Sequence, residues 1–273
     1  MSVTTMRNKN KKKPADLIVF IILEAILYLL FMTMDAISSF GDPLQSSLYT
    51  GLVKTGVITP SLLKYYAIII CLGISVLRYF KKNRKETTIL TGAMFFTAVS
   101  DYFLLLNPGN ILPGLVSFFI VHSIYLYVIN NGELKKTVIT VLIRIGVSVA
   151  VALALILTGI LKFKNDQNMT ALAILIILYG LSFVSNFFKI SLKFFAKTKK
   201  DKECLFPNFK FFLLGLTLFI LCDINVLIYN LDSFFSISSG FYSTLKAAAS
   251  ILMWGFYLPS QVLIVLSGLR ERY

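Results

Sequence analysis

Residues 208–229 read NFKFFLLGLTLFILCDINVLIY, and this stretch decides the kind of fold that the chain adopts. A helix needs about 20 mostly apolar residues to cross the hydrocarbon core of a bilayer, which is about 30 Å thick. The stretch has that length, and Asp223 is the one acidic residue within it. Because backbone groups that face lipid must be hydrogen-bonded internally, we expect a membrane-spanning helix here.

Seven further segments meet the same requirement: 16–36, 60–79, 87–106, 111–130, 137–160, 170–190 and 245–269. The sequence therefore predicts an all-α, polytopic integral membrane bundle of eight transmembrane helices. One domain covers 16–269, with a basic tail at 1–15 and a short tail at 270–273. The first segment is too long for the apolar part of a cleaved signal peptide, so we expect it to be retained.

The composition excludes several classes of protein. The 273 residues are 57% hydrophobic and 15% charged, whereas a soluble domain has about 45–50% apolar and about 25% charged residues. A soluble enzyme, a disordered tail and a nucleic-acid-binding domain are therefore excluded. The net charge of +14 is accordingly no sign of a nucleic-acid partner.

The positive charges predict the orientation of the spans. With the N-terminus in the cytoplasm, 21 of the 27 Lys and Arg lie in inside segments and five lie outside. The remaining one, Arg144, lies within a span. Because cytoplasmic loops of membrane proteins carry the excess of Lys and Arg, we expect a cell-membrane protein with both termini cytoplasmic.

The usual signatures of cofactor and nucleophile chemistry are missing from the sequence. Cys71, Cys204 and Cys222 are scattered, with no CxxC spacing, and are interpreted as packing residues rather than disulfide or metal ligands. His122 is the single histidine. There is no GxSxG, HExxH or P-loop motif. We expect no cofactor and assign no metal ligand; a metal site made of carboxylates alone stays open, without support in the sequence.

Four charged residues lie well inside predicted spans, namely Glu24, Asp101, Arg144 and Asp223. A charge at mid-membrane costs at least about 2.5 kcal/mol, so each needs an explanation. We expect the Arg144 side chain to reach the cytoplasmic surface. For Glu24 the simpler interpretation is a purely structural salt bridge with Arg144. The two aspartates lie 14 and 15 residues into spans that start on the same side. Their matched depth favours a functional role.

Uncharged polar residues recur at helical spacing on three spans. The three faces are Gly114, Phe118, His122 and Tyr125; Gly215, Phe219 and Asp223; and Trp254, Tyr257 and Gln261. A glycine on each of the first two faces lets a neighbouring helix approach closely, so both faces are expected to point into the bundle. Pro259 is expected to free a carbonyl in the last span. Simpler interpretations are an interhelical hydrogen bond for His122 and plain packing for Trp254 and Tyr257.

Four segments carry a resemblance to a known family. They are Ser100-Asp101 followed by the apolar run 102–106; Gly114, Phe118, His122 and Tyr125; Gly215, Phe219, Cys222 and Asp223; and Tyr257 with Gln261. In order and spacing this set resembles the YhhN-like family, the eight-span lysoplasmalogenases. Ser100 stands where that family usually has Gly, and Cys222 where it usually has Ser, so a hydroxyl beside Asp223 is absent.

The resemblance implies hydrolysis of the vinyl ether bond of lysoplasmalogens, with release of a fatty aldehyde and a glycerophospho-ethanolamine or -choline. Such hydrolysis passes through an oxocarbenium ion, a problem that glycosidases solve with two carboxylates. We therefore expect Asp101 and Asp223 to be the acid/base pair, with neither role assigned. Substrate binding is expected from the residues His122, Tyr125, Tyr257 and Gln261. The expected partners are a lysophospholipid substrate and membrane lipids; the oligomeric state is left open.

Two alternatives stay open at this point. A small proton-coupled transporter would use the same intramembrane carboxylates as a proton relay. Because the aspartates are four spans apart, a parallel repeat of four plus four spans is then conceivable. A structural or chaperone-like membrane subunit would use its polar residues only to join helices. That interpretation predicts Asp101 and Asp223 far apart, each with a separate partner.

Overall fold

The computed structural model describes residues 15–40, 59–158, 167–196, 204–230 and 240–269. The tails predicted at either end lie outside these ranges, except for Ala15. The helices run over α1 Ala15–Phe40, α3 Pro60–Lys82, α4 Lys85–Asp101, the π-helical turn η1 Tyr102–Leu106, α5 Ile111–Ile129, α6 Leu134–Leu157, α7 Gln167–Phe195, α8 Phe209–Tyr229 and α9 Gly240–Gly268.

The predicted all-α bundle of eight spans is confirmed. Eight helices in the described ranges are long and apolar enough to cross a membrane, with α4 and η1 forming one span. Most boundaries lie within a few residues of the predicted ones. The largest differences are at α7, which extends on both sides of 170–190, and α9, which begins at Gly240. Polar turns at those ends continue the helix beyond its apolar centre.

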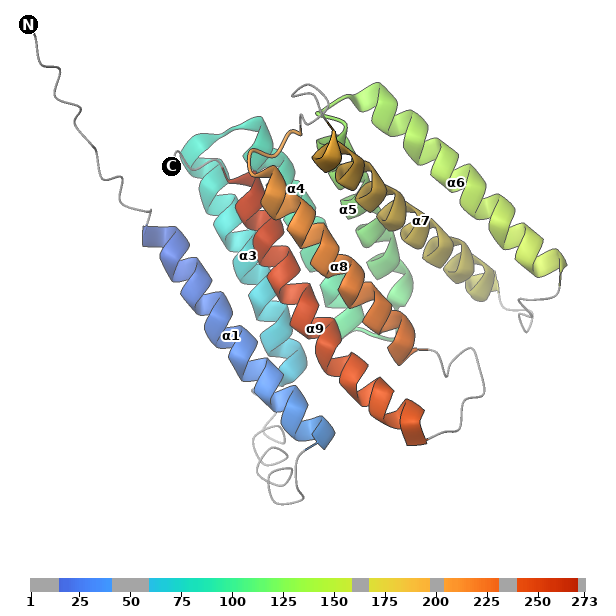
Figure 1. Cartoon of the computed structure of the whole chain (residues 1–273), viewed down its shortest axis with the longest axis horizontal. Helices are drawn as coiled ribbons and strands as arrows, with labels where there is room; N and C mark the ends of the chain where they lie inside the picture. Colours follow the sequence, from blue (N-terminus) through green and yellow to red (C-terminus); the bar gives the residue numbers. More distant parts are fainter. Residues whose placement is uncertain (1–14, 41–58, 159–166, 197–203, 231–239, 270–273) are drawn as a thin grey trace, which may run out of the picture.

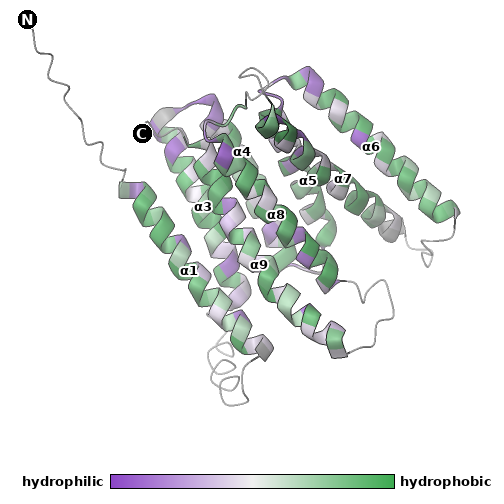
Figure 2. Cartoon of the chain, in the orientation of Figure 1, coloured by the Kyte–Doolittle hydropathy of each residue, from purple (hydrophilic) through white to green (hydrophobic). Residues whose placement is uncertain are grey.

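The helices run alternately up and down, so the described ends of the chain, at Ala15 and Leu269, lie at the same end of the bundle (Figure 1). Helix α9 contacts α1, α3, α4 and α8, and α6 lies at the opposite edge from α1. Apolar residues cover the lengths of the helices, and hydrophilic ones gather near their ends (Figure 2). Leu29 on α1 and Leu142 on α6 are 64% and 61% exposed. Such outward apolar faces are suited to lipid.

Local sequence explains where the helices begin and end. Thr59 caps α3, its hydroxyl accepting a hydrogen bond from the Leu62 amide, with Pro60 at the first helical position. Asn83 ends α3 in the left-handed conformation, at φ 32°. Gly132, at φ 82°, makes the turn between α5 and α6. These short turns make consecutive helices antiparallel neighbours.

Two glycines bring helices together as predicted. At Gly114 a Cβ would lie 3.2 Å from Leu104 and 3.3 Å from the Ser100 carbonyl, and the Ser100 hydroxyl donates to the Gly114 carbonyl over 2.7 Å. At Gly215 a Cβ would lie 2.9 Å from Ile264 Cγ1 and 3.1 Å from the Ser260 carbonyl. Backbone contact at these points fixes α4 against α5 and α8 against α9.

Pro259 lies inside α9, where it has no N–H to donate to the Gly255 carbonyl four residues earlier. The Tyr28 hydroxyl of α1 donates to that carbonyl over 3.2 Å. The carbonyl that the proline frees is therefore used to attach α1 to α9. A second contact supports the same join, since the Phe31 and Trp254 rings lie 5.8 Å apart at their centroids.

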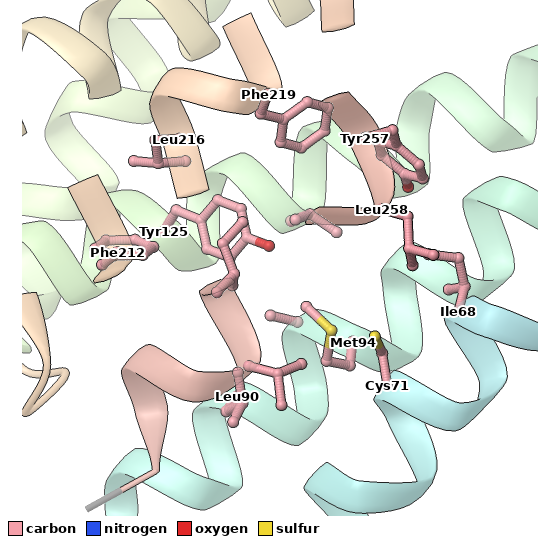
Figure 3. Close-up of a cluster of buried hydrophobic side chains, with 14 of the residues drawn as sticks. Ile68, Cys71, Leu90, Met94, Tyr125, Phe212, Leu216, Phe219, Tyr257 and Leu258 are labelled. Atoms are coloured by element: carbon pink, nitrogen blue, oxygen red, sulfur yellow. The ribbon is translucent and has the colours of Figure 1, made fainter. Parts of the chain in front are cut away.

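The apolar core lies between α3, α4, α5, α8 and α9 (Figure 3). Its fully buried large side chains include Ile68, Leu90, Met94 and Leu216. The ring of Tyr125 packs against Phe212, with centroids 5.5 Å apart. Phe219 and Tyr257 belong both to this cluster and to the site described below.

Replacing Gly215 with alanine is expected to lower the free energy of unfolding by about 1–3 kcal/mol, because the added methyl meets the backbone of α9. Gly180→Ala is the matched control, since a Cβ at Gly180 meets no atom within 4 Å. It should leave stability unchanged or raise it by up to about 1 kcal/mol. Denaturant unfolding of the purified proteins measures both, and equal effects would contradict the close approach.

Tyr28→Phe is expected to lower the free energy of unfolding by about 0.5–1.5 kcal/mol, the usual net value of one hydrogen bond. In a Pro259→Ala background the loss should be smaller, because the new alanine supplies an N–H to the Gly255 carbonyl. A double-mutant cycle measures this coupling. Strictly additive effects would show that Tyr28 does not compensate for the proline.

Candidate active site

Asp101 is the last residue of α4 and is only 3% exposed. Its carboxylate accepts a hydrogen bond of 2.7 Å from the Tyr257 hydroxyl of α9. The chain widens into a π-helical turn directly after it, and the Asn107 amide donates to the Tyr102 carbonyl five residues back. Such turns within helices occur frequently at functional sites. No residue in the apolar run 102–106 indicates this widening.

Asp223 lies on α8 and accepts a hydrogen bond of 2.7 Å from the Tyr179 hydroxyl of α7. Sequence reasoning missed Tyr179. The signal available was its spacing, because Tyr179, Phe183 and Asn186 recur at i+4 and i+3 and so share one face of α7. The two aspartates thus have the same kind of partner, a tyrosine hydroxyl from another helix.

The two aspartate–tyrosine pairs meet on one aromatic ring. The centroid of the Phe118 ring lies 6.4 Å from that of Tyr257 and 5.9 Å from that of Tyr179. Phe219 lies 5.5 Å from Tyr257 and 5.9 Å from Phe118. Both carboxylates also lie within electrostatic range of the Tyr179 hydroxyl. Each aspartate has a separate partner, as a purely structural role predicts, but the rings of both tyrosine partners belong to one aromatic cluster.

His122 lies in this aromatic cluster and is fully buried. Its ring centroid lies 5.1 Å from that of Tyr179 and 5.6 Å from that of Phe219. Neither ring nitrogen has a hydrogen-bond partner among the described residues. The interhelical hydrogen bond considered for this side chain is therefore wrong; it is the backbone carbonyl of His122 that accepts one, from Asn186 over 2.8 Å.

The other predicted binding residues lie at different distances from the aspartates. Tyr257 contacts Asp101 directly. Tyr125 contacts His122 ring to edge, at 5.9 Å, and its hydroxyl points into the apolar cluster of Figure 3. Gln261 is fully buried, and its amide nitrogen lies 3.4 Å from the Ser260 hydroxyl. The contact of Gln261 is therefore within α9, rather than with either aspartate.

Trp254 lies beside the site on the same face of α9, its ring 5.0 Å from that of Tyr257. The Lys64 ammonium lies over the Trp254 ring, 5.1 Å from its centroid, and pairs with Asp35 over 2.7 Å. An ion pair between α1 and α3 therefore borders the aromatic cluster. The Trp254 ring therefore contacts a charged group as well as the rings that plain packing predicts.

The two expectations for Arg144 and Glu24 are wrong. Arg144 is 6% exposed and donates through Nη2 to the Asn186 side chain over 2.8 Å, instead of reaching the surface. Glu24 accepts a hydrogen bond of 3.3 Å from the Cys71 thiol, instead of pairing with Arg144. The reason is topological, because α1 and α6 lie at opposite edges of the bundle.

All three cysteines are free. Cys71 and Cys222 are buried, the latter next to Asp223 in the chain. Cys204 lies before α8, and burial raises the pKa of its thiol to about 11, so the thiol stays protonated at neutral pH. No group of three or more His, Cys, Asp or Glu suited to a metal ion occurs in the part of the chain that the structure describes.

The comparison with protein families matches residues 61–268 to the YhhN family. The match covers α3 to α9 and therefore includes both aspartates and their tyrosine partners; α1 precedes it. No curated protein and no solved structure matches the chain.

Tyr179→Phe is expected to lower the free energy of unfolding by about 1–3 kcal/mol, because it leaves the partly buried Asp223 carboxyl without its donor. Tyr66→Phe is the matched control, since Tyr66 on α3 is 51% exposed. Its effect should stay within about 0.5 kcal/mol. Thermal or denaturant unfolding of the two variants in detergent compares them, and a neutral Tyr179→Phe would contradict the pairing.

Proposed function

The chain belongs to the YhhN family, and on that premise we propose that it is a membrane-embedded hydrolase of lysoplasmalogen-type lysophospholipids. It cleaves the vinyl ether bond to release a fatty aldehyde and a glycerophospho-alcohol. The observation that carries the proposal is the pair of intramembrane aspartates, Asp101 buried and Asp223 partly buried, each bound to a tyrosine hydroxyl and joined to the other through one aromatic cluster.

The reaction uses the two carboxyl groups in turn. One, in its acid form, donates a proton to the alkene carbon farther from the oxygen, which leaves an oxocarbenium ion. The other, as a carboxylate, takes a proton from a water molecule whose oxygen adds to the cationic carbon. The resulting hemiacetal loses the glycerol oxygen as an alcohol, its hydroxyl proton passing to that oxygen, and the aldehyde remains.

The surroundings of the aspartates suit this chemistry. The rings of Phe118, Phe219 and Trp254 lie around Tyr257, and aromatic rings can stabilise cations such as an oxocarbenium ion through their faces. The Tyr257 and Tyr179 hydroxyls hold the carboxylates in place. His122, whose ring nitrogens have no partner among the described residues, is available to orient water or a glycerol oxygen. We assign Tyr125 and Gln261 supporting roles in substrate binding.

The proposal includes the location. The 21 to 5 distribution of Lys and Arg supports a multi-pass protein of the cell membrane with both termini in the cytoplasm. In that orientation α4 and α8 both start at the cytoplasmic side, and Asp101 and Asp223 lie toward their far ends. A lysolipid would enter sideways between helices, its headgroup toward the cytoplasm.

A small proton-coupled transporter is the second candidate, and one observation favours it. Most helix contacts repeat after four spans: α1–α3 corresponds to α6–α7, α3–α4 to α7–α8, α4–α5 to α8–α9, α5–α6 to α9–α1, and α5–α7 to α9–α3. The α4–α9 contact has no counterpart between α8 and α5 among the described residues. Parallel repeats of this kind are common in transporters. A carrier would move protons with its solute in liposomes and release no aldehyde.

Asp101→Asn and Asp223→Asn are each expected to reduce aldehyde release from a lysoplasmalogen by at least about 100-fold, since each removes a group that transfers a proton. Asp16→Asn is the control, because Asp16 pairs with Arg78 and Lys81 at the far end of α1. It should keep nearly full activity. Aldehyde formation by purified protein measures all three, and activity retained in both site variants would overturn the proposal.

A further inference from the structure

Arg144 is a buried charge whose surroundings leave it unsatisfied. It lies near the middle of α6 and is 6% exposed. One nitrogen, Nη2, donates to Asn186, while Nε and Nη1 have no partner among the described residues. No carboxylate in that part of the chain pairs with it. A guanidinium in hydrocarbon is costly unless it is paired, so two free donor groups at this depth require an anion.

Asn186 sets the position of the guanidinium. Its side-chain oxygen accepts from Arg144, and its side-chain nitrogen donates to the His122 carbonyl over 2.8 Å. Three helices, α5, α6 and α7, are thereby joined at one point. The guanidinium is thus linked through Asn186 to the backbone of His122, whose ring lies in the aromatic cluster of the candidate site.

Further positive charge lies next to Arg144. Lys189 follows Asn186 by one turn of α7, is partly exposed, and lies within electrostatic range of both Arg144 and Lys136. Lys136 lies in the first turn of α6 and is exposed. Together these three cations, which we call the α6–α7 basic ladder, lead from one end of the span to its middle. Planar guanidinium with ammonium groups is the donor set that phosphate prefers.

The spacing along α7 matches one kind of phosphate. Asn186, which holds the guanidinium, is seven residues from Tyr179, which binds Asp223; this is roughly 10 Å along the axis. In a lysoplasmalogen the phosphorus is about five bonds from the vinyl ether oxygen, roughly 6 Å when extended. A phosphate hydrogen-bonded to the guanidinium adds about 3 Å, so a phosphate at Arg144 places the vinyl ether near the level of Asp223 along the axis.

We propose that the α6–α7 basic ladder, with Arg144 at its inner end, binds the phosphate of the lysophospholipid headgroup. This inference deepens the proposed function and rests on it for the identity of the lipid. A lipid fits better than free phosphate, because the outer face of α6 is apolar, Leu142 and Ile143 being 61% and 60% exposed. A ligand that arrives through lipid has to carry its own apolar chain.

Binding to the purified full-length protein in detergent tests the site without any hydrolysis. The two probes are an alkyl-ether lysophosphocholine, which has no vinyl ether, and the alkylglycerol of equal chain length, which has no phosphate. The wild type is expected to bind the first at least about 10-fold more tightly. Arg144→Gln should reduce that preference to within about 2-fold, and Lys189→Gln should reduce it by about 3-fold. Lys210→Gln, at an exposed position in the first turn of α8, is the control and should keep it.

The outcomes separate the site from the reaction. A phosphate preference unchanged in both Arg144→Gln and Lys189→Gln would overturn the site, even if the protein hydrolyses lysoplasmalogen. A preference lost in these variants supports it, even if no aldehyde is formed. If Arg144→Gln does not fold, as its melting temperature will show, Lys189→Gln decides. Inorganic phosphate is the last probe. If it raises the melting temperature of the wild type while the lysophosphocholine binds no more tightly than the alkylglycerol, the lipid assignment is overturned.

Discussion

The bundle depends on one constraint: a charged side chain inside the membrane needs a hydrogen-bond partner within the protein, since no water is available to it. The four charged residues deep in the spans each find that partner on another helix. Asp101 binds Tyr257, Asp223 binds Tyr179, Glu24 binds Cys71, and the guanidinium of Arg144 binds Asn186. These pairs tie together α4 and α9, α7 and α8, α1 and α3, and α6 and α7. Polar contacts therefore specify these neighbours, as the close approach at Gly114 and Gly215 specifies α4 with α5 and α8 with α9.

Much of the fold followed from the sequence, because span length and apolarity are local properties. The eight spans, the close approach at Gly114 and Gly215, and the carbonyl freed by Pro259 each depend on a few consecutive residues. The partners did not follow, because they depend on which helices pack together. Glu24 and Arg144 looked like a pair of opposite charges, but their helices lie at opposite edges of the bundle. Tyr179 was missed because a tyrosine in an apolar span is ordinary until its neighbour is known.

The candidate site was predictable in part for the same reason. Asp101 and Asp223 stood out because a charge in a span is costly wherever it lies, and Tyr257 stood out by its spacing from Gln261. The structure adds Phe118 as the ring that joins the two pairs, and it places Gln261 against Ser260 instead. The π-helical turn after Asp101 is invisible in the sequence 102–106, which is simply apolar.

The partners of the acidic residues divide them into two kinds, and the division bears on chemistry. Near the two ends of α1, Asp16 and Asp35 pair with cations, with Arg78 and Lys81 for the first and Lys64 for the second. Toward the middle of the bundle, Asp101 and Asp223 meet only hydroxyl donors among the described residues. A neighbouring cation keeps a carboxylate charged, so that the carboxylate has a structural role. A hydroxyl donor can stay hydrogen-bonded to the group in either form, because a neutral carboxyl still offers an acceptor oxygen. Of these four aspartates, Asp101 and Asp223 are therefore the two whose carboxyl groups can take up and release a proton while keeping the hydrogen bond that joins their helices.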